Sequence, residues 1–169
     1  MTRRLSAYLS GGMEYARDEG RDWRRTIEKW IVSELGHSVF NPNTESKKYL
    51  KRRLPKGNLR KLKFSNVDRF QAIVRGIVML DSLEIARRSD YVICLWDTSA
   101  QRGAGTKGEL TIARFFDKPV YMVTRMKRSS IPGWILGCTT EIFESFGELK
   151  VQLKKEYGGE RIDRTPSRK

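Results

Sequence analysis

Short apolar runs alternate along the chain with longer stretches in which apolar residues recur at helical spacing. Five short runs are candidate strands: 5–10, 38–41, 90–96, 119–124 and 140–143. Four longer stretches are candidate helices: 22–35, 67–88, 106–117 and 146–157. The run 90–96 gives the strongest strand signal because it is apolar on both faces, which is typical of a parallel strand covered by helices on either side.

Strands separated by segments of helix length predict parallel β-α-β units with right-handed crossovers. We therefore expect an α/β fold, a three-layer sandwich with a four- or five-stranded parallel sheet. No internal repeat or domain boundary is visible, so we expect one domain over 1–157 and a basic, disordered tail over 158–169. Ligands of such sheets bind beyond the carboxyl ends of the strands. This rule selects three loops: 10–17, 97–106 and 124–132.

The charge of the chain is strongly positive. Among 169 residues, 34 Lys and Arg face 20 Asp and Glu, a formal net charge of +14. Such a balance favours an anionic partner, whether nucleic acid, a nucleotide or an anionic membrane surface.

Much of this charge lies in a basic insertion at 44–66, because no acidic residue occurs between Glu45 and Asp68. We expect a solvated charged loop, away from the loop 97–109, with a weak nucleic-acid contact through Lys47–Lys63 as a further option.

Several classes of protein are excluded by composition. The longest apolar run, 73–80, contains Arg75 and is far too short to span a membrane. No secretory signal is visible, so we expect a cytoplasmic protein. Cys94 and Cys138 cannot build a disulfide framework, and no Cys/His cluster suggests a metal site. The single histidine, His37, follows a glycine at an expected helix end and is interpreted as structural. Any catalysis is therefore expected to be carboxylate chemistry.

The loop after the strongest strand carries the clearest candidate chemistry. Its three glycines, Gly103, Gly105 and Gly108, let the backbone approach a ligand, and the following helix N-terminus adds partial positive charge. Glu109 lies one turn into that helix, at the expected carboxyl edge of the sheet. The pattern Thr106-x-x-Glu109 is also a capping box, in which Glu109 only satisfies a helix-end donor, and spacing alone favours this second interpretation.

An ordered set of motifs resembles the nucleoside 2-deoxyribosyltransferase family, which includes deoxyribonucleoside 5′-monophosphate N-glycosidases. The motifs are Tyr8-Leu-Ser-Gly-Gly-Met13, Ser89-Asp90 with the strand after it, Asp97, and Gly105-Thr-Lys-Gly-Glu-Leu110 followed by Ala113. The resemblance extends from Leu5 to about Val123. It implies a flavodoxin-like sheet, no metal or cofactor, a deoxynucleoside or deoxynucleotide substrate, and a homodimer or higher homo-oligomer.

The resemblance also implies roles for individual residues. Glu109 matches the nucleophile that attacks C1′ of a deoxyribosyl group, and Tyr8 matches a tyrosine that orients it. The substrate would lie against Ser10, Gly11 and Gly12, against Gly105 and Thr106, and against Asp97, whose carboxylate would accept a hydrogen bond from the sugar. Gly12 replaces the proline usual in the family, and Asp97 could instead form a turn.

The general acid that protonates the departing base is harder to place. Counting back from Asp90 puts Ser82 at the position where the family has an aspartate, with Asp81 one residue early. One residue turns a helix by about 100°, so Asp81 is either the acid or a solvated helix residue, and we favour the acid.

The leading hypothesis is thus an enzyme that cleaves or transfers the N-glycosidic bond of 2′-deoxynucleosides or their 5′-monophosphates through a covalent glycosyl-glutamate. Transfer and hydrolysis both stay open. Two alternatives stay open as well: a nucleic-acid-binding module with an inactive pocket, and a nucleotide-sensing domain without turnover.

Overall fold

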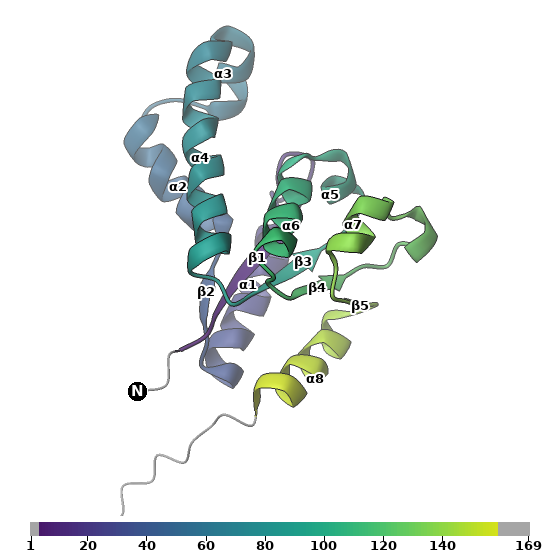
Figure 1. The fold of residues 1–169 in the computed structure, drawn as a ribbon. Coiled ribbons are helices and arrows are strands. Elements are labelled where there is room, and N and C mark those ends of the chain that lie inside the picture. The colour runs from purple at the N-terminus through teal and green to yellow at the C-terminus, as the bar shows by residue number, and fades with distance from the viewer. Residues whose placement is uncertain (1–3, 159–169) are drawn as a thin grey trace, which may run out of the picture.

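Five parallel strands form one sheet at the centre of the protein (Figure 1). The computed structural model describes residues 4–158. The strands are β1 (Ser6–Gly11), β2 (Ser38–Phe40), β3 (Tyr91–Leu95), β4 (Val120–Val123) and β5 (Glu141–Phe143). Their order in the sheet is β2-β1-β3-β4-β5, and every neighbouring pair is parallel. The predicted α/β class with a four- or five-stranded parallel sheet is confirmed, with five strands.

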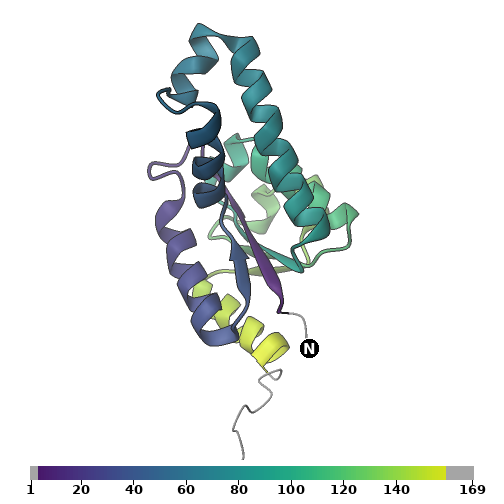
Figure 2. The same cartoon turned by 90° about the vertical axis from the view of Figure 1, so that its left-hand side faces the viewer.

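The helices cover both faces of the sheet and include two short non-α segments (Figures 1 and 2). They are α1 (Arg21–Trp30), continued by a π-helical turn, η1 (Ile31–Leu35), then α2 (Pro42–Arg53), α3 (Leu59–Ser65), α4 (Val67–Arg87), α5 (Thr98–Arg102), α6 (Gly105–Phe115), the 3₁₀ turn η2 (Arg128–Ser130), α7 (Gly133–Cys138) and α8 (Phe146–Tyr157).

Two apolar clusters hold the three layers together, one on each face of the sheet. On one face, α1 and α8 pack on alternate strand residues such as Leu9 and Ile93. On the other, α4, α6 and α7 pack on the residues between them, such as Tyr8 and Val92. Because successive residues of a strand point to opposite faces, a strand buried on both sides reads as a continuous apolar run. This three-layer arrangement is consistent with a flavodoxin-like sandwich.

The basic segment 44–66 is not a loop. It forms most of α2 and all of α3, which with the first half of α4 extend beyond the carboxyl edge of the sheet; we call residues 42–75 the helical arm (Figures 1 and 2). An asparagine begins each of its helices: the side chains of Asn41, Asn58 and Asn66 accept hydrogen bonds from backbone N–H groups of α2, α3 and α4. Such caps satisfy donors that a helix end leaves free.

Other differences from the predicted elements are local. The short helix α5 lies within the predicted loop 97–106, and α7 lies in a segment for which no element was predicted. The predicted structural role of His37 is confirmed: this buried side chain lies 2.9 Å from the Tyr91 hydroxyl through Nδ1. No helix within residues 4–158 is long and apolar enough to cross a membrane. All of the predicted tail except Gly158 lies outside the described residues.

Candidate functional site

The carboxylate of Glu109 lies at the carboxyl end of β1 and is held by two side chains of that strand. The Tyr8 hydroxyl donates to Oε1 at 3.1 Å, and the Ser10 hydroxyl donates to Oε2. Tyr8 and Ser10 are two residues apart, so both point to the face of the sheet that α6 covers. The capping-box interpretation is therefore wrong: α6 begins at Gly105 without a side-chain cap, and the Glu109 carboxylate bonds to β1 instead.

Burial disfavours the charged form of Glu109, and three neighbouring groups favour it. Burial raises the pKa of the Glu109 carboxyl, while the hydrogen bond from Ser10, the positive charge of Arg24 and the hydrogen bond from Tyr8 lower it. Burial and the charge of Glu109 raise the pKa of Tyr8 well above its ordinary value, so its hydroxyl keeps the proton that it donates. Tyr8 also stacks on Phe40 with ring centroids 5.4 Å apart, which fixes the ring. Glu109 as a residue is only partly buried.

Asp81 approaches this carboxylate from α4. Burial and then the charge of Glu109 raise the pKa of the Asp81 carboxyl to about 8, whereas Arg24 and the Tyr8 hydroxyl lower it. Its Oδ1 atom is buried and has no hydrogen-bond partner among residues 4–158. At neutral pH, the Asp81 carboxyl thus holds a proton beside the Glu109 carboxyl, whose own pKa burial raises. The structure brings the two residues predicted as acid and nucleophile together at one edge of the sheet.

Replacing Asp81 by Asn will change how stability depends on pH. A carboxyl whose folded pKa is raised from 3.8 to about 8 stabilises the fold only at low pH, and this contribution is lost as pH rises through the folded pKa. The neutral amide does not titrate. We expect Asp81→Asn to gain about 2 kcal/mol over the wild-type protein between about pH 5.5 and pH 8.5, after allowance for partial solvation of the site. Urea unfolding at both pH values measures the difference, and equal free-energy changes at the two pH values would contradict it.

Asp97 caps the short helix α5 just after β3. Its Oδ1 accepts hydrogen bonds from the Ala100 N–H at 2.9 Å and from the Ser99 hydroxyl at 2.6 Å. The turn-forming role that the sequence left open for Asp97 is thus present, and its contact with a sugar stays a prediction. The predicted contacts of Gly105 and Thr106 also stay predictions; both lie in the first turn of α6, where the Thr106 side chain is buried.

The Gly11-Gly12 turn lies flush against α5. A Cβ atom added to Gly12 would overlap the Ser99 hydroxyl and lie 2.7 Å from the Ala100 nitrogen, and one added to Gly11 would lie 2.9 Å from the Trp23 ring. The turn must therefore lack side chains, and both of its glycines are buried.

We expect Gly12→Ala to destabilise the protein by about 2 kcal/mol, because the start of α5 must shift to admit the methyl group. Gly108→Ala in α6 is the matched control: its Cβ would meet nothing within 4 Å, and the exchange should stabilise the helix by about 0.5–1 kcal/mol. Thermal unfolding of the two variants measures both effects. A Gly12→Ala protein as stable as the wild type would show that the turn is not closely packed.

Arg24 is the main site residue that the sequence argument did not assign a role. Its guanidinium group, in a residue only 1% exposed, donates to the carbonyl oxygens of Gly11 at 2.7 Å, Gly20 at 3.0 Å, and Leu9 and Glu19 at 3.2 Å. One arginine thus binds the end of β1 and the loop that follows it. The signal for it was available, because Arg24 lies three residues before Ile27 and seven before Ile31, on the buried face of α1.

The helical arm meets the same loop through α3. Lys63 forms an ion pair with Glu14 at 3.1 Å. Arg60 donates to the Glu14 carbonyl oxygen at 3.3 Å and lies 3.7 Å from the Glu19 carboxylate. Through these contacts α3 is fastened to the loop between β1 and α1.

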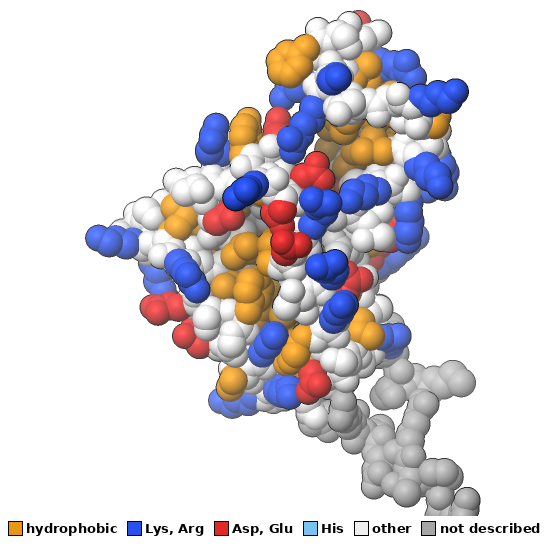
Figure 3. Space-filling view, turned by 180° about the vertical axis from the view of Figure 1, so that it is seen from behind, with side chains coloured by type: hydrophobic (Ala, Val, Ile, Leu, Met, Phe, Trp, Pro, Cys, Tyr) orange, Lys and Arg blue, Asp and Glu red, His pale blue; other side chains and the backbone are white. Residues whose placement is uncertain are grey.

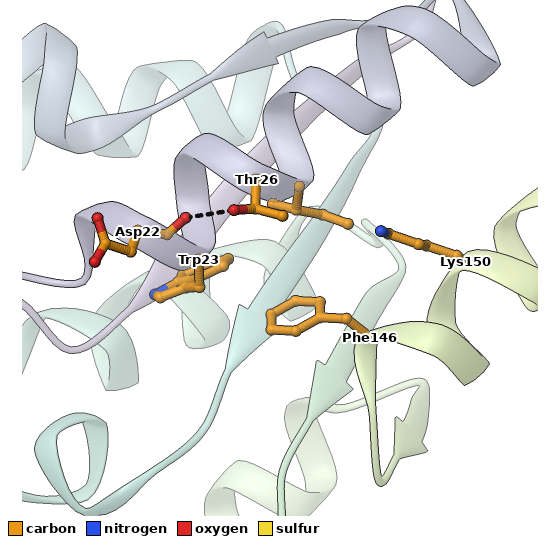
Figure 4. A pocket seen from close by; sticks show the side chains of 6 residues that line it. Asp22, Trp23, Thr26, Phe146 and Lys150 are labelled. Carbon is orange, nitrogen blue, oxygen red and sulfur yellow. Dashed lines mark hydrogen bonds between the residues drawn. The ribbon is translucent and has the colours of Figure 1, made fainter.

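Two surface hollows lie elsewhere. One is a recess between α1 and α8, in which Trp23 and Phe146 stack with ring centroids 5.6 Å apart and Lys150 lies at the edge (Figure 4). It lies on the face of the sheet opposite to Glu109. The other follows β4 and is lined by Thr124, Arg125, Met126 and Glu144. Neither contains a pair of carboxyl groups.

No group of three or more His, Cys, Asp or Glu side chains within residues 4–158 could hold a metal ion. Comparison of the chain with known protein families and with curated proteins gave no match.

Proposed function

We propose that this protein cleaves or transfers the N-glycosidic bond of 2′-deoxynucleosides or their 5′-monophosphates. The observation that carries the proposal is the pair of neighbouring carboxyl groups: Glu109, held by hydrogen bonds from Tyr8 and Ser10, and Asp81, whose pKa is raised to about 8. A carboxylate nucleophile beside a carboxylic acid is the pair that cleavage with a covalent glycosyl intermediate requires. The motif resemblance over 5–123 supports the same chemistry.

In the first step, a Glu109 oxygen forms a bond to C1′ of the deoxyribosyl group while the bond from C1′ to the base breaks. The electron pair of the breaking bond stays on the base, and Asp81 donates its proton there, so the base leaves neutral. The product on the protein is a glycosyl ester of Glu109. The hydrogen bonds from Tyr8 and Ser10 fix the carboxylate before substrate arrives.

In the second step, a water molecule or a second base attacks C1′ and releases Glu109. The ionised Asp81 left by the first step accepts the proton of the attacking group, which restores both carboxyl groups to their starting states. Water gives hydrolysis and a base gives transfer, with the same residues in the same roles.

Replacement of Glu109 by Gln should abolish this activity, because an amide is not a nucleophile of comparable strength. We expect the rate of base release from a panel of deoxynucleosides and their 5′-monophosphates to fall at least about a thousandfold. Glu144→Gln, an exposed glutamate after β5, is the matched control and should leave the rate unchanged. Chromatography of the free base measures both. Wild-type protein that releases or exchanges no base, or a Glu109→Gln variant that keeps its activity, would refute the proposal.

The pH profile should identify Asp81 as the acid. We expect kcat/KM to fall above about pH 8, where Asp81 loses its proton, and to fall on the acid side as the pH drops through the raised pKa of Glu109. In Asp81→Asn the alkaline limb should disappear and the rate should drop about a hundredfold or more. The loss should shrink for bases that leave readily without a proton. An alkaline limb that persists in Asp81→Asn would assign the acid to another group.

A further inference from the structure

The helical arm is an exposed cationic surface. Eleven Lys and Arg residues and only two acidic residues, Glu45 and Asp68, lie between 42 and 75. All eleven basic residues are exposed: Lys47, Lys48, Lys51, Arg52, Arg53, Lys56, Arg60, Lys61, Lys63, Arg69 and Arg75. In Figure 3, Lys and Arg side chains gather along the outer edge of the arm.

Little of this charge is neutralised by the protein itself. Within residues 4–158, three of the eleven cations form ion pairs with carboxylates: Lys48, Arg60 and Lys63. Two of these three pairs fasten the arm to the loop after β1, and the remaining cations face solvent. Like charges held this close repel one another, which costs stability unless an anion binds them.

Burial in the core does not explain why the chain has the helical arm. Helix α3 contains no buried residue, and the buried residues of α2 are confined to its first turns. At the tip, Phe64 is 90% exposed and Val67 62% exposed. A segment that buries so little apolar surface adds little to the core, so its composition points to a role at the surface.

We propose that the helical arm binds the phosphate backbone of a polynucleotide, with Phe64 available to stack on an unpaired base. The cations are spread along the arm. The stretches from Lys47 to Arg53 and from Arg69 to Arg75 each span about 9 Å of helix. A duplex presents about one charge per 1.7 Å of its axis, so each row faces several phosphates. Exposed Phe64, beside Lys61 and Lys63, offers the aromatic platform typical of single-strand binding.

The arm is also joined to the loop that follows β1. Arg60 and Lys63 hold the loop that follows Gly12, and this loop is fastened to Arg24 below it. The inference does not depend on the proposed function, because the cations of the arm are separate from Glu109 and Asp81. It goes beyond that function by adding a second partner, a polymer, to a protein whose proposed substrate is a single nucleotide.

The test is the fluorescence anisotropy of labelled DNA of about twenty nucleotides, longer than common single-strand site sizes. Single-stranded and duplex probes are titrated at several salt concentrations with wild-type protein and with the triple variant Lys47→Glu, Lys61→Glu, Arg69→Glu. Lys61 and Arg69 lie in the first turns of α3 and α4, where a glutamate favours the helix, so this variant should stay folded. Circular dichroism checks the fold.

We expect the triple variant to bind at least about tenfold more weakly and to lose about two to three units from the slope of log affinity against log salt. The control is Arg25→Glu, Lys29→Glu, Lys155→Glu on the α1 and α8 side, which changes the net charge equally at exposed residues and should keep wild-type binding. Phe64→Ala should weaken binding of the single strand more than of the duplex, and an unchanged ratio would remove the stacking role.

Three results would overturn the inference: no binding of either probe at low salt, equal losses in the two triple variants, or tight binding to vesicles of phosphatidylcholine and phosphatidylserine with none to DNA. Glu109→Gln should bind DNA as the wild type does. A protein that binds DNA through the arm but releases no base would therefore refute the proposed function and leave this inference intact.

Discussion

The hydrogen bonds that Tyr8 and Ser10 donate to Glu109 are the interaction on which the site depends. They join the end of β1 to α6 across a sequence separation of about a hundred residues. They exist because β1 is buried on both sides: its alternate residues Ala7 and Leu9 pack against α1 and α8, which leaves Tyr8 and Ser10 to face α6. The parallel order β2-β1-β3 then sets the Gly11-Gly12 turn beside the loop that follows β3.

A partly buried carboxylate needs positive charge nearby, and Arg24 provides it from the opposite side of β1. Its guanidinium group donates hydrogen bonds to backbone carbonyl groups and so holds the turn after β1 in place. Its positive charge also acts to lower the pKa of Glu109 and of Asp81. The same residue thus sets both the shape and the electrostatics of the site. Burial and the charge of Glu109 outweigh Arg24 at Asp81, whose pKa is raised to about 8.

The fold could be predicted from the sequence because its apolar pattern is strong where strands and helices are buried; the helix predicted over 146–157 has the bounds of α8. Short helices with few buried residues, α3 and α5, give no such pattern and were missed. Their signals were local caps, Asn58 and Asp97. The motifs selected Glu109 and Asp81, and the structure places these two residues close together. The place of Arg24 on the buried face of α1 was visible in the sequence, but its partners were not, because most of them are backbone carbonyl groups.

The contact between Gly12 and Ser99 has a consequence for how this sequence can change over time. In the family that the motifs resemble, a proline is usual where this chain has Gly12. Here a Cβ at that position would overlap the Ser99 hydroxyl, which is held in place by Asp97. A proline could therefore occupy position 12 only together with a different residue, or a different start of α5, at 97–99. The turn at Gly12 and residues 97–99 are far apart in sequence, but a change in one should require a change in the other. Proteins that descend from this chain should therefore keep both segments or replace both.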